Sequence, residues 1–363
     1  MRIHNFCAGP CTLPLDVLEE VQAELLDFEG SGMSVIEMSH RSAEYEAVHE
    51  EALTLFRENA GVPDDFTILF LQGGATLQFA LVPMNLLGEG ASAGYVRSGT
   101  WGKGALKDAA AWGEAYAAWD GESIAFSRMP SDDELELRPD TRYLHVTSNE
   151  TIEGIRMSSF PDIDLPLVGD MSSDYLSRPV PWERFDLVYG GAQKNLGPAG
   201  LAVMVVRTAA FEEMRTDLPS YLRLRAHADK HSLMNTPPMF AIYVTGKVLR
   251  WMRDRGGVAG MEERAARRSG AVYDAIDGSD GFYRSPVEPV HRSHMNVVFR
   301  TPSDELDAAF LAGAEEHGMR NLKGHRSVGG IRASIYNAMT DDGVDALVGF
   351  MASFRGSGRD ASG

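Results

Sequence analysis

The sequence has few cysteines and no long apolar run. Only Cys7 and Cys11 occur among 363 residues, and their spacing lacks the second ligand pair that a structural zinc site needs. A disulfide between them is not expected in a reducing cytosol. The longest clean apolar run, Leu201–Val206, is far shorter than a membrane span, and no signal peptide is visible. We therefore expect a soluble, cytoplasmic protein with no metal site and no membrane partner.

Basic residues are scarce relative to acidic ones. The chain has 34 Lys and Arg against 52 Asp and Glu, which gives a formal net charge of −18. This balance excludes the broad basic surface that nucleic-acid binding requires. A site for an anionic small molecule would have to be locally positive against this background. Small groups of Arg and His are therefore informative.

Short apolar strands alternate with amphipathic helices from about residue 14 to residue 255. Helical spacing predicts helices over 14–30, 45–61, 74–87 and 240–253. We interpret Ser34–Met38 as strand-like. The clearest strand signals are Thr67–Leu71, Gly94–Arg97, Tyr143–Thr147, Leu165–Gly169, Asp186–Tyr189 and Leu201–Arg207. This alternation predicts an α/β fold in which helices cover both faces of a mainly parallel sheet.

The pair Gly256-Gly257 is typical of a hinge, and beyond it the pattern changes to a smaller α+β domain. We predict a large domain over residues 1–257, with an N-terminal segment that could pack with the small domain. The small domain covers 258–355, and the Gly/Ser-rich tail 356–363 is expected to be disordered.

Lys194 lies between two apolar strands, in a Gly-rich segment without other charges. Burial would lower the pKa of its amine, and the neutral amine is the form that makes a Schiff base with a carbonyl cofactor. The spacing alone leaves a surface loop lysine equally open. Asp170, 24 residues earlier, ends an apolar strand and should project from the carboxyl edge of the sheet. A carboxylate there could keep a pyridine nitrogen protonated, or it could cap the next turn with Ser172 and Ser173. The pairing with Lys194 favours the functional interpretation.

Two further features fit a planar, phosphorylated cofactor. The strand that ends at Gln72 is followed by Gly73-Gly74 and a helix start, where free N–H groups attract an anion and Thr76 adds a hydroxyl. Trp101 could lie against a planar ring, although such a tryptophan is more often part of the core.

Three groups of cations are candidates for substrate anions: His40-Arg41, His325-Arg326 and Arg332. Arginine binds carboxylate or phosphate through two parallel hydrogen bonds. Taken one at a time, each could be a solvated surface charge.

Motifs along nearly the whole chain resemble the phosphoserine aminotransferase family of the class V aminotransferases, which have the type I pyridoxal-phosphate fold. The matching segments are Ser39-His-Arg41, Gln72-Gly-Gly74, Asn149-Glu-Thr-Ile-Glu-Gly154, Gly191-Ala-Gln-Lys-Asn195, Asn235-Thr-Pro-Pro238, Lys323-Gly-His-Arg326 and Arg332-Ala-Ser-Ile-Tyr-Asn-Ala338.

This resemblance implies roles for individual residues. Lys194 would hold pyridoxal phosphate and later carry a proton as general base and acid, and Asp170 would face the pyridine nitrogen. The other implied cofactor contacts are Trp101 on the ring, Thr151 at the phenolic oxygen, Ala75, Thr76 and Gln193 at the phosphate, and Asn235 and Thr236 at the same phosphate from a neighbouring subunit. The implied substrate contacts are Arg41 and Arg332 for carboxylates, with His40, His325 and Arg326 completing the anion pocket.

The implied reaction transfers the amino group of L-glutamate to 3-phosphohydroxypyruvate, giving O-phospho-L-serine and 2-oxoglutarate in serine biosynthesis. It would be carried out by a homodimer with shared sites, and 4-phosphohydroxythreonine could be a second substrate. Two alternatives remain: another class V enzyme such as an alanine–glyoxylate aminotransferase, and a non-catalytic binding protein of the same fold.

Overall fold

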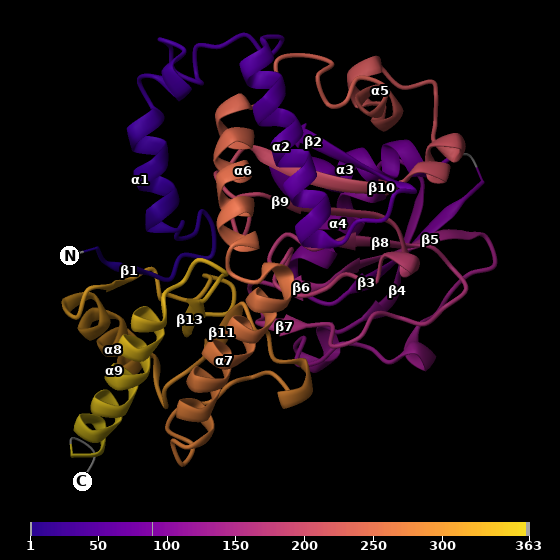
Figure 1. The fold of residues 1–363 in the computed structure, drawn as a ribbon. Helices are drawn as coiled ribbons and strands as arrows, with labels where there is room; N and C mark the ends of the chain where they lie inside the picture. The colour runs from indigo at the N-terminus through magenta and orange to yellow at the C-terminus, as the bar shows by residue number, and fades with distance from the viewer. Residues whose placement is uncertain (1, 89, 361–363) are drawn as a thin grey trace.

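The computed structural model describes residues 2–88 and 90–360, and its larger part is built around a seven-stranded sheet (Figure 1). The strand order is β2-β10-β9-β8-β5-β3-β4, and every neighbouring pair from β9 to β4 is parallel. Only β10 runs antiparallel to both of its neighbours. The strands are β2 Phe66–Gln72, β3 Ser92–Arg97, β4 Glu114–Asp120, β5 Thr141–Thr147, β8 Leu167–Asp170, β9 Phe185–Gly191 and β10 Leu201–Arg207. The expected mainly parallel sheet is confirmed.

Helices cover both faces of this sheet because its central strands are apolar on both faces. On one face, α2 (Ala43–Ala60) and α6 (Met239–Arg253) pack against alternate residues of the strands. On the other face, α3 (Gly74–Leu86) and α4 (Thr100–Ala109) cover the intervening residues. None of the helices within the described ranges is long and apolar enough to cross a membrane.

A second group of elements lies at the lower left of Figure 1, with its own apolar core around Phe299 and Phe310. The elements of this group are β11 Asn296–Phe299 and β13 Ile331–Ser334, which are antiparallel, with α7 Gly257–Asp277, α8 Asp304–Glu316 and α9 Asp341–Asp360. Strand β1 (His4–Asn5) pairs in parallel with β12 (Met319–Arg320), so the first residues of the chain lie beside this group. The remaining helices and strands are α1 Leu15–Glu24, α5 Leu224–Ala228, β6 Asn149–Glu150 and β7 Ile155–Arg156. The domain boundary at residue 257 stays a prediction.

The chain departs from the predicted elements between residues 25 and 38. Helix α1 ends at Glu24 and does not continue to Gly30, because the Asp27 carboxylate accepts a hydrogen bond from Gly32 N and closes a turn. The expectation of a strand over Ser34–Met38 is wrong. Ser34 N donates a hydrogen bond to the Glu37 carboxylate, and Glu37 N donates one to Ser34 O. These local bonds close a turn and take the place of hydrogen bonds to a neighbouring strand.

Two elements and part of the tail also differ from expectation. Helix α4 and strand β4 were not predicted, since α4 contains two glycines and β4 is an edge strand with few buried residues. Helix α9 continues through residues 356–360, in the segment expected to be disordered, because each added helical residue gains a backbone hydrogen bond. Residues 361–363 lie outside the described part of the chain.

Candidate functional site

A cavity of about 260 Å³ opens at the carboxyl ends of β5, β8 and β9. It is the size of a small-molecule site, and ligands bind at this edge in α/β sheets. Nine of the residues singled out from the sequence line it: Ala75, Thr76, Trp101, Thr151, Asp170, Gln193, Lys194, His325 and Arg332.

Lys194 is buried, with 9% of its surface exposed, on the short turn between β9 and β10. Its Nζ donates a hydrogen bond of 2.9 Å to Thr151 Oγ1 and lies 5.6 Å from the ring centroid of Trp101. Burial lowers the pKa of this amine to about 8, although the carboxylates of Asp170 and Glu150 act in the opposite direction. The neutral amine is therefore available near physiological pH, as expected from the sequence.

Asp170 is the last residue of β8 and is 4% exposed. Its Oδ1 accepts hydrogen bonds from Ser172 N at 2.9 Å and Ser172 Oγ at 2.6 Å. Burial raises the pKa of this carboxyl group, and Lys194 opposes the shift. The same side chain therefore caps a turn and lines the cavity with Lys194, and its role at a pyridine nitrogen stays a prediction.

The Gly-rich turn after β2 has the expected anion-binding form. Gly73 adopts a φ of 86°, which favours glycine, and α3 begins at Gly74 without a side-chain cap. The first-turn N–H groups of a helix lack intrahelical partners. Ala75 and Thr76 belong to this turn and line the cavity. Gln193 lines the same cavity, and its Oε1 is buried without a partner among the described residues.

One cation and one histidine border the cavity from the second group of elements. Arg332 comes from β13, and His325 comes from the loop that precedes it. Arg332 Nε is buried without a hydrogen-bond partner within the described ranges. Burial and the positive charges of Arg332 and Arg326 lower the pKa of His325. The cavity therefore has a positive side, although the whole chain carries a formal charge of −18.

Five residues singled out from the sequence do not line this cavity. Arg41, Asn235, Thr236 and Arg326 are exposed, and His40 is half-buried. Thr236 Oγ1 lies 3.2 Å from His40 Nδ1, and Thr236 O accepts a 3.0 Å hydrogen bond from Gln72 Nε2. His40 and Thr236 therefore lie together, outside the cavity that Lys194 lines.

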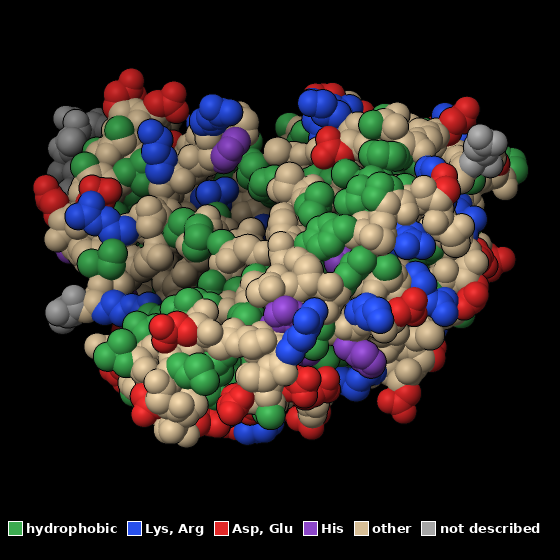
Figure 2. All heavy atoms as spheres, turned by 90° about the horizontal axis from the view of Figure 1, so that it is seen from above, with side chains coloured by type: hydrophobic (Ala, Val, Ile, Leu, Met, Phe, Trp, Pro, Cys, Tyr) green, Lys and Arg blue, Asp and Glu red, His purple; other side chains and the backbone are tan. Residues whose placement is uncertain are grey.

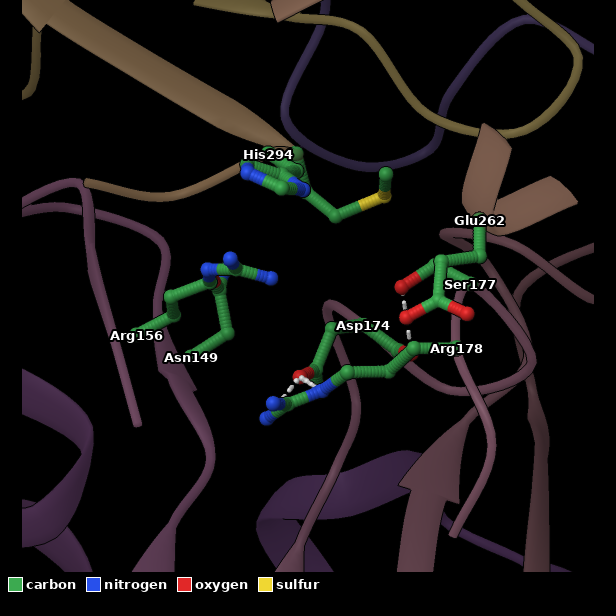
Figure 3. A pocket seen from close by; sticks show the side chains of 8 residues that line it. Asn149, Arg156, Asp174, Ser177, Arg178, Glu262 and His294 are labelled. Carbon is green, nitrogen blue, oxygen red and sulfur yellow. Dashed lines mark hydrogen bonds and ion pairs between the residues drawn. The ribbon is translucent and has the colours of Figure 1, made fainter. Parts of the chain in front are cut away.

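A second, much smaller cavity adjoins the first, since Asn149 lines both. Figure 3 shows Arg156 and His294 facing Asp174 and Arg178 across it. Its volume of about 10 Å³ holds roughly one water molecule. Arg178 Nη2 lies 3.0 Å from Asp174 Oδ2 in a nearly buried ion pair, and burial together with Arg156 and Arg178 lowers the pKa of His294 to about 4. The cavity is too small for a metabolite, and its charged groups join the two groups of elements.

Sequence reasoning missed the residues that hold the site in place. Glu150 and Glu153 are buried and bind the first turn of α4, which carries Trp101. Their signal was present in the segment Asn149–Gly154, where two acids occur in an otherwise uncharged, buried stretch. Only the fold shows what they contact.

The comparisons with known proteins agree with this geometry. The family model described as aminotransferase class-V matches residues 3–347. The phosphoserine aminotransferase of Laribacter hongkongensis is 50% identical over 354 residues, which cover 98% of this chain and 99% of that protein. The structure of phosphoserine aminotransferase from Bacillus circulans subsp. alkalophilus aligns with a TM-score of 0.96 at 48% identity and covers 98% of this chain and 99% of that one. A pyridoxal-phosphate-bound phosphoserine aminotransferase from Trichomonas vaginalis aligns with a TM-score of 0.93 at 36% identity, over 97% and 100% of the two chains.

Proposed function

The chain belongs to the phosphoserine aminotransferase family of the class V aminotransferases, and on this basis we propose that it transfers the amino group of L-glutamate to 3-phosphohydroxypyruvate. The products are O-phospho-L-serine and 2-oxoglutarate, which places the enzyme in serine biosynthesis. The observation that carries this proposal is the shared cavity, where a buried Lys194 faces Trp101 and lies with Asp170 beside the cation Arg332.

The residues around the cavity fit pyridoxal phosphate. Unpartnered polar atoms border it at Trp101 Nε1 and Gln193 Oε1 among the described residues, and the N-terminus of α3 supplies a cradle for a phosphate. When bound, this cofactor supplies the carbonyl that takes up the amino group and the ring that withdraws the electron pair. The residues that would hold it are Lys194 at the carbonyl, Asp170 at the pyridine nitrogen, Thr151 at the phenolic oxygen, Trp101 on the ring face, and Ala75, Thr76 and Gln193 at the phosphate.

Lys194 and Asp170 have different roles: Lys194 transfers a proton, and Asp170 would stabilise the protonated pyridine nitrogen. With a pKa of about 8, the Lys194 amine takes up and releases a proton near neutral pH, so it can move a proton between the substrate Cα and the cofactor C4′. With the cofactor bound, the Asp170 carboxylate would face the pyridine nitrogen and favour its protonated form. Ser172 fixes the direction of this carboxylate through two hydrogen bonds.

The cations bind the anionic ends of the substrates. Arg332 borders the cavity and binds a carboxylate with its guanidinium group, while His325 contributes beside it. Arg41 would bind a substrate carboxylate as well. His40 and Arg326, which do not line the cavity of their own chain, would complete with His325 the pocket for the substrate phosphate or the distal carboxylate of glutamate, in part from across a dimer interface. A pocket with this many cations favours phosphorylated substrates, and 4-phosphohydroxythreonine is a candidate second substrate.

In a homodimer, residues that are exposed on one subunit would contribute to the cavity of the partner subunit. Asn235 and Thr236 would reach the cofactor phosphate of the partner subunit. The connection between α1 and α2 exposes Leu26 (85%) and Ile36 (58%), and Figure 2 shows apolar side chains gathered over the face seen from above. Exposed apolar patches are typical of protein interfaces. Mixing a Lys194→Ala subunit with an Asn235→Ala subunit should restore activity through one intact site per mixed dimer, and an inactive mixture would contradict shared sites.

The two free cysteines, Cys7 and Cys11, suit a reducing compartment, so we propose the cytoplasm as the location.

The deciding experiment is the visible absorption spectrum of the purified protein loaded with pyridoxal phosphate. We expect a yellow band that bleaches with glutamate and returns with 3-phosphohydroxypyruvate but not with glyoxylate or unphosphorylated hydroxypyruvate. A band that returns with any keto acid would support another class V aminotransferase, such as an alanine–glyoxylate enzyme. A protein that stays colourless would contradict the proposal from Lys194 onward, and unchanged activity in Lys194→Ala would favour a different role for this fold.

A further inference from the structure

Two buried glutamates from a distant segment hold the first turn of α4. Glu153 Oε1 accepts hydrogen bonds from Thr100 N at 2.9 Å and Thr100 Oγ1 at 2.7 Å. Glu150 Oε2 accepts from Trp101 N at 2.9 Å, and Glu150 Oε1 accepts from Gly102 N at 2.8 Å. The helix has no side-chain cap of its own, so these carboxyl groups satisfy the N–H groups that a helix N-terminus leaves free.

Glycines at positions 99 and 102 leave space for the two glutamate side chains beside this turn. A Cβ atom on Gly99 would lie 2.6 Å from Glu153 Oε2 and 2.7 Å from Glu150 Cδ. A Cβ atom on Gly102 would lie 2.7 Å from Val96 O and 3.2 Å from Glu150 Oε1, so the backbone of β3 constrains this position as well. Gly99 has a φ of 175°, which any residue can adopt. The close approach of the glutamates therefore accounts for glycine at position 99, whereas backbone strain does not.

The hydrogen bonds of the two glutamates also differ, which bears on where the pair holds a proton. Burial raises the pKa of both neighbouring acids, although the charge of Arg332 acts against this shift at Glu153, and the pair titrates as a unit. Both Glu150 oxygens face N–H or O–H groups, including Ser98 Oγ at 3.1 Å, so the geometry favours Glu150 as the acceptor of the pair. Glu153 Oε2 is buried and has no partner among the described residues, so it is the oxygen that a proton can occupy.

Trp101 depends on this arrangement for its place in the cavity. Its indole borders the cavity, 5.6 Å from Lys194 Nζ to the ring centroid. The indole Nε1 has no hydrogen-bond partner within the described ranges. The polar contact that fixes the residue is therefore the one between its backbone N–H and Glu150.

We propose that Glu150 is a positioning residue, whose carboxylate fixes the backbone of Trp101 and thereby sets the indole against the cofactor ring. Glu153 is its neutral neighbour, which carries the proton of the pair and leaves Glu150 ionised. This inference rests on the proposed function, because the ring that Trp101 faces is that of pyridoxal phosphate.

The test compares Glu150→Gln with Glu153→Gln in the full-length protein. Pyridoxal phosphate is titrated into the cofactor-free protein, and quenching of tryptophan fluorescence gives its dissociation constant. Circular dichroism of the visible band reports the orientation of the bound ring. Glu150→Gln places an amide NH₂ against a backbone N–H, so we expect about tenfold weaker binding and an altered dichroic band, as for the loss of an aromatic contact. An amide replaces a protonated carboxyl group well, so Glu153→Gln should change the dissociation constant by less than about twofold.

A double-mutant cycle with Trp101→Ala shows whether Glu150 acts through Trp101. In the Trp101→Ala background, Glu150→Gln should cause no further weakening of cofactor binding. If Glu150→Gln does not fold, Glu150→Asp takes its place in the cycle, because it keeps the charge but withdraws it by one methylene.

Three results would overturn the inference: wild-type binding and dichroism in the Glu150 variant, equal effects of the two Gln variants, or an undiminished effect of Glu150→Gln without Trp101. A wild-type protein that fails to bind pyridoxal phosphate would overturn the proposed function and this inference with it. The wild-type control therefore separates the two failures.

Discussion

Replacement of Lys194 by methionine should stabilise the cofactor-free protein at neutral pH. Burial lowers the pKa of the Lys194 amine from 10.5 to about 8, and each pKa unit corresponds to about 1.4 kcal/mol. The protonated lysine thus destabilises the fold by about 3 kcal/mol at pH 7. Methionine has a similar shape and no charge, but it loses the hydrogen bond to Thr151, which is worth about 1 kcal/mol. The net expected gain in the free energy of unfolding is about 2 kcal/mol.

The sign of the pH dependence follows from the direction of the shift. The unfolded lysine binds a proton more tightly than the folded one, so the wild-type protein gains stability as pH rises from about 8 toward 10.5. At pH 10 most of the penalty is gone and the remainder is offset by the lost hydrogen bond to Thr151, so the advantage of the methionine variant should nearly vanish. Titrations of groups that do not interact with Lys194 cancel in the difference between the two proteins.

Urea denaturation of both cofactor-free proteins at pH 7 and pH 10, at one fixed protein concentration, measures this difference. Lys103→Met is a matched control, because Lys103 is 59% exposed and its replacement should change stability by less than about 0.5 kcal/mol at either pH. A Lys194→Met variant that is less stable than wild type at pH 7 would refute the reasoning. So would an advantage that stays constant between the two pH values.

Three further predictions concern single side chains. Asp170→Asn should keep the fold, because the amide oxygen can still accept both hydrogen bonds from Ser172; transamination should fall by about 10²–10⁴-fold, and a melting temperature far below wild type would show that the loss is structural. Arg332→Met should raise the KM for the phosphorylated keto acid by about 10- to 100-fold, because one charge-assisted interaction is lost; steady-state kinetics with an unchanged KM would remove Arg332 from the substrate pocket. Arg178→Met should destabilise the protein by about 3–5 kcal/mol, measured by urea denaturation, because Asp174 is left buried without its ion-pair partner at 3.0 Å; a stability equal to wild type would mean that Asp174 is neutral.

The site residues on the sheet were predictable because parallel strands have a fixed geometry. Asp170 and the segment before Lys194 end neighbouring strands, so their carboxyl ends meet at one edge. The helix N-terminus after β2 followed from its glycines in the same way. Local pattern was sufficient in both cases, because each side chain is placed by the strand that carries it.

Helix α4 was not predictable from its own residues. It has two glycines and no side-chain cap, and its first turn is completed by Glu150 and Glu153, about 50 residues later in the chain. Interactions of this kind override local propensity. The same limit applies to the exposed Asn235 and Thr236, since the described chain brings them beside His40 and away from the cavity.

The pairing of β1 with β12 has a consequence for the order in which the protein is completed. His4 pairs with Met319, so strand β1 meets its partner only after the segment up to β12 has been synthesised. Ala8 and Gly9 follow this strand directly and form part of the cavity wall. Contacts between residues so distant in sequence form late, because the entropy of closing the loop opposes them. The cofactor cavity is therefore closed last, and a nascent chain that stops before residue 319 has no finished site.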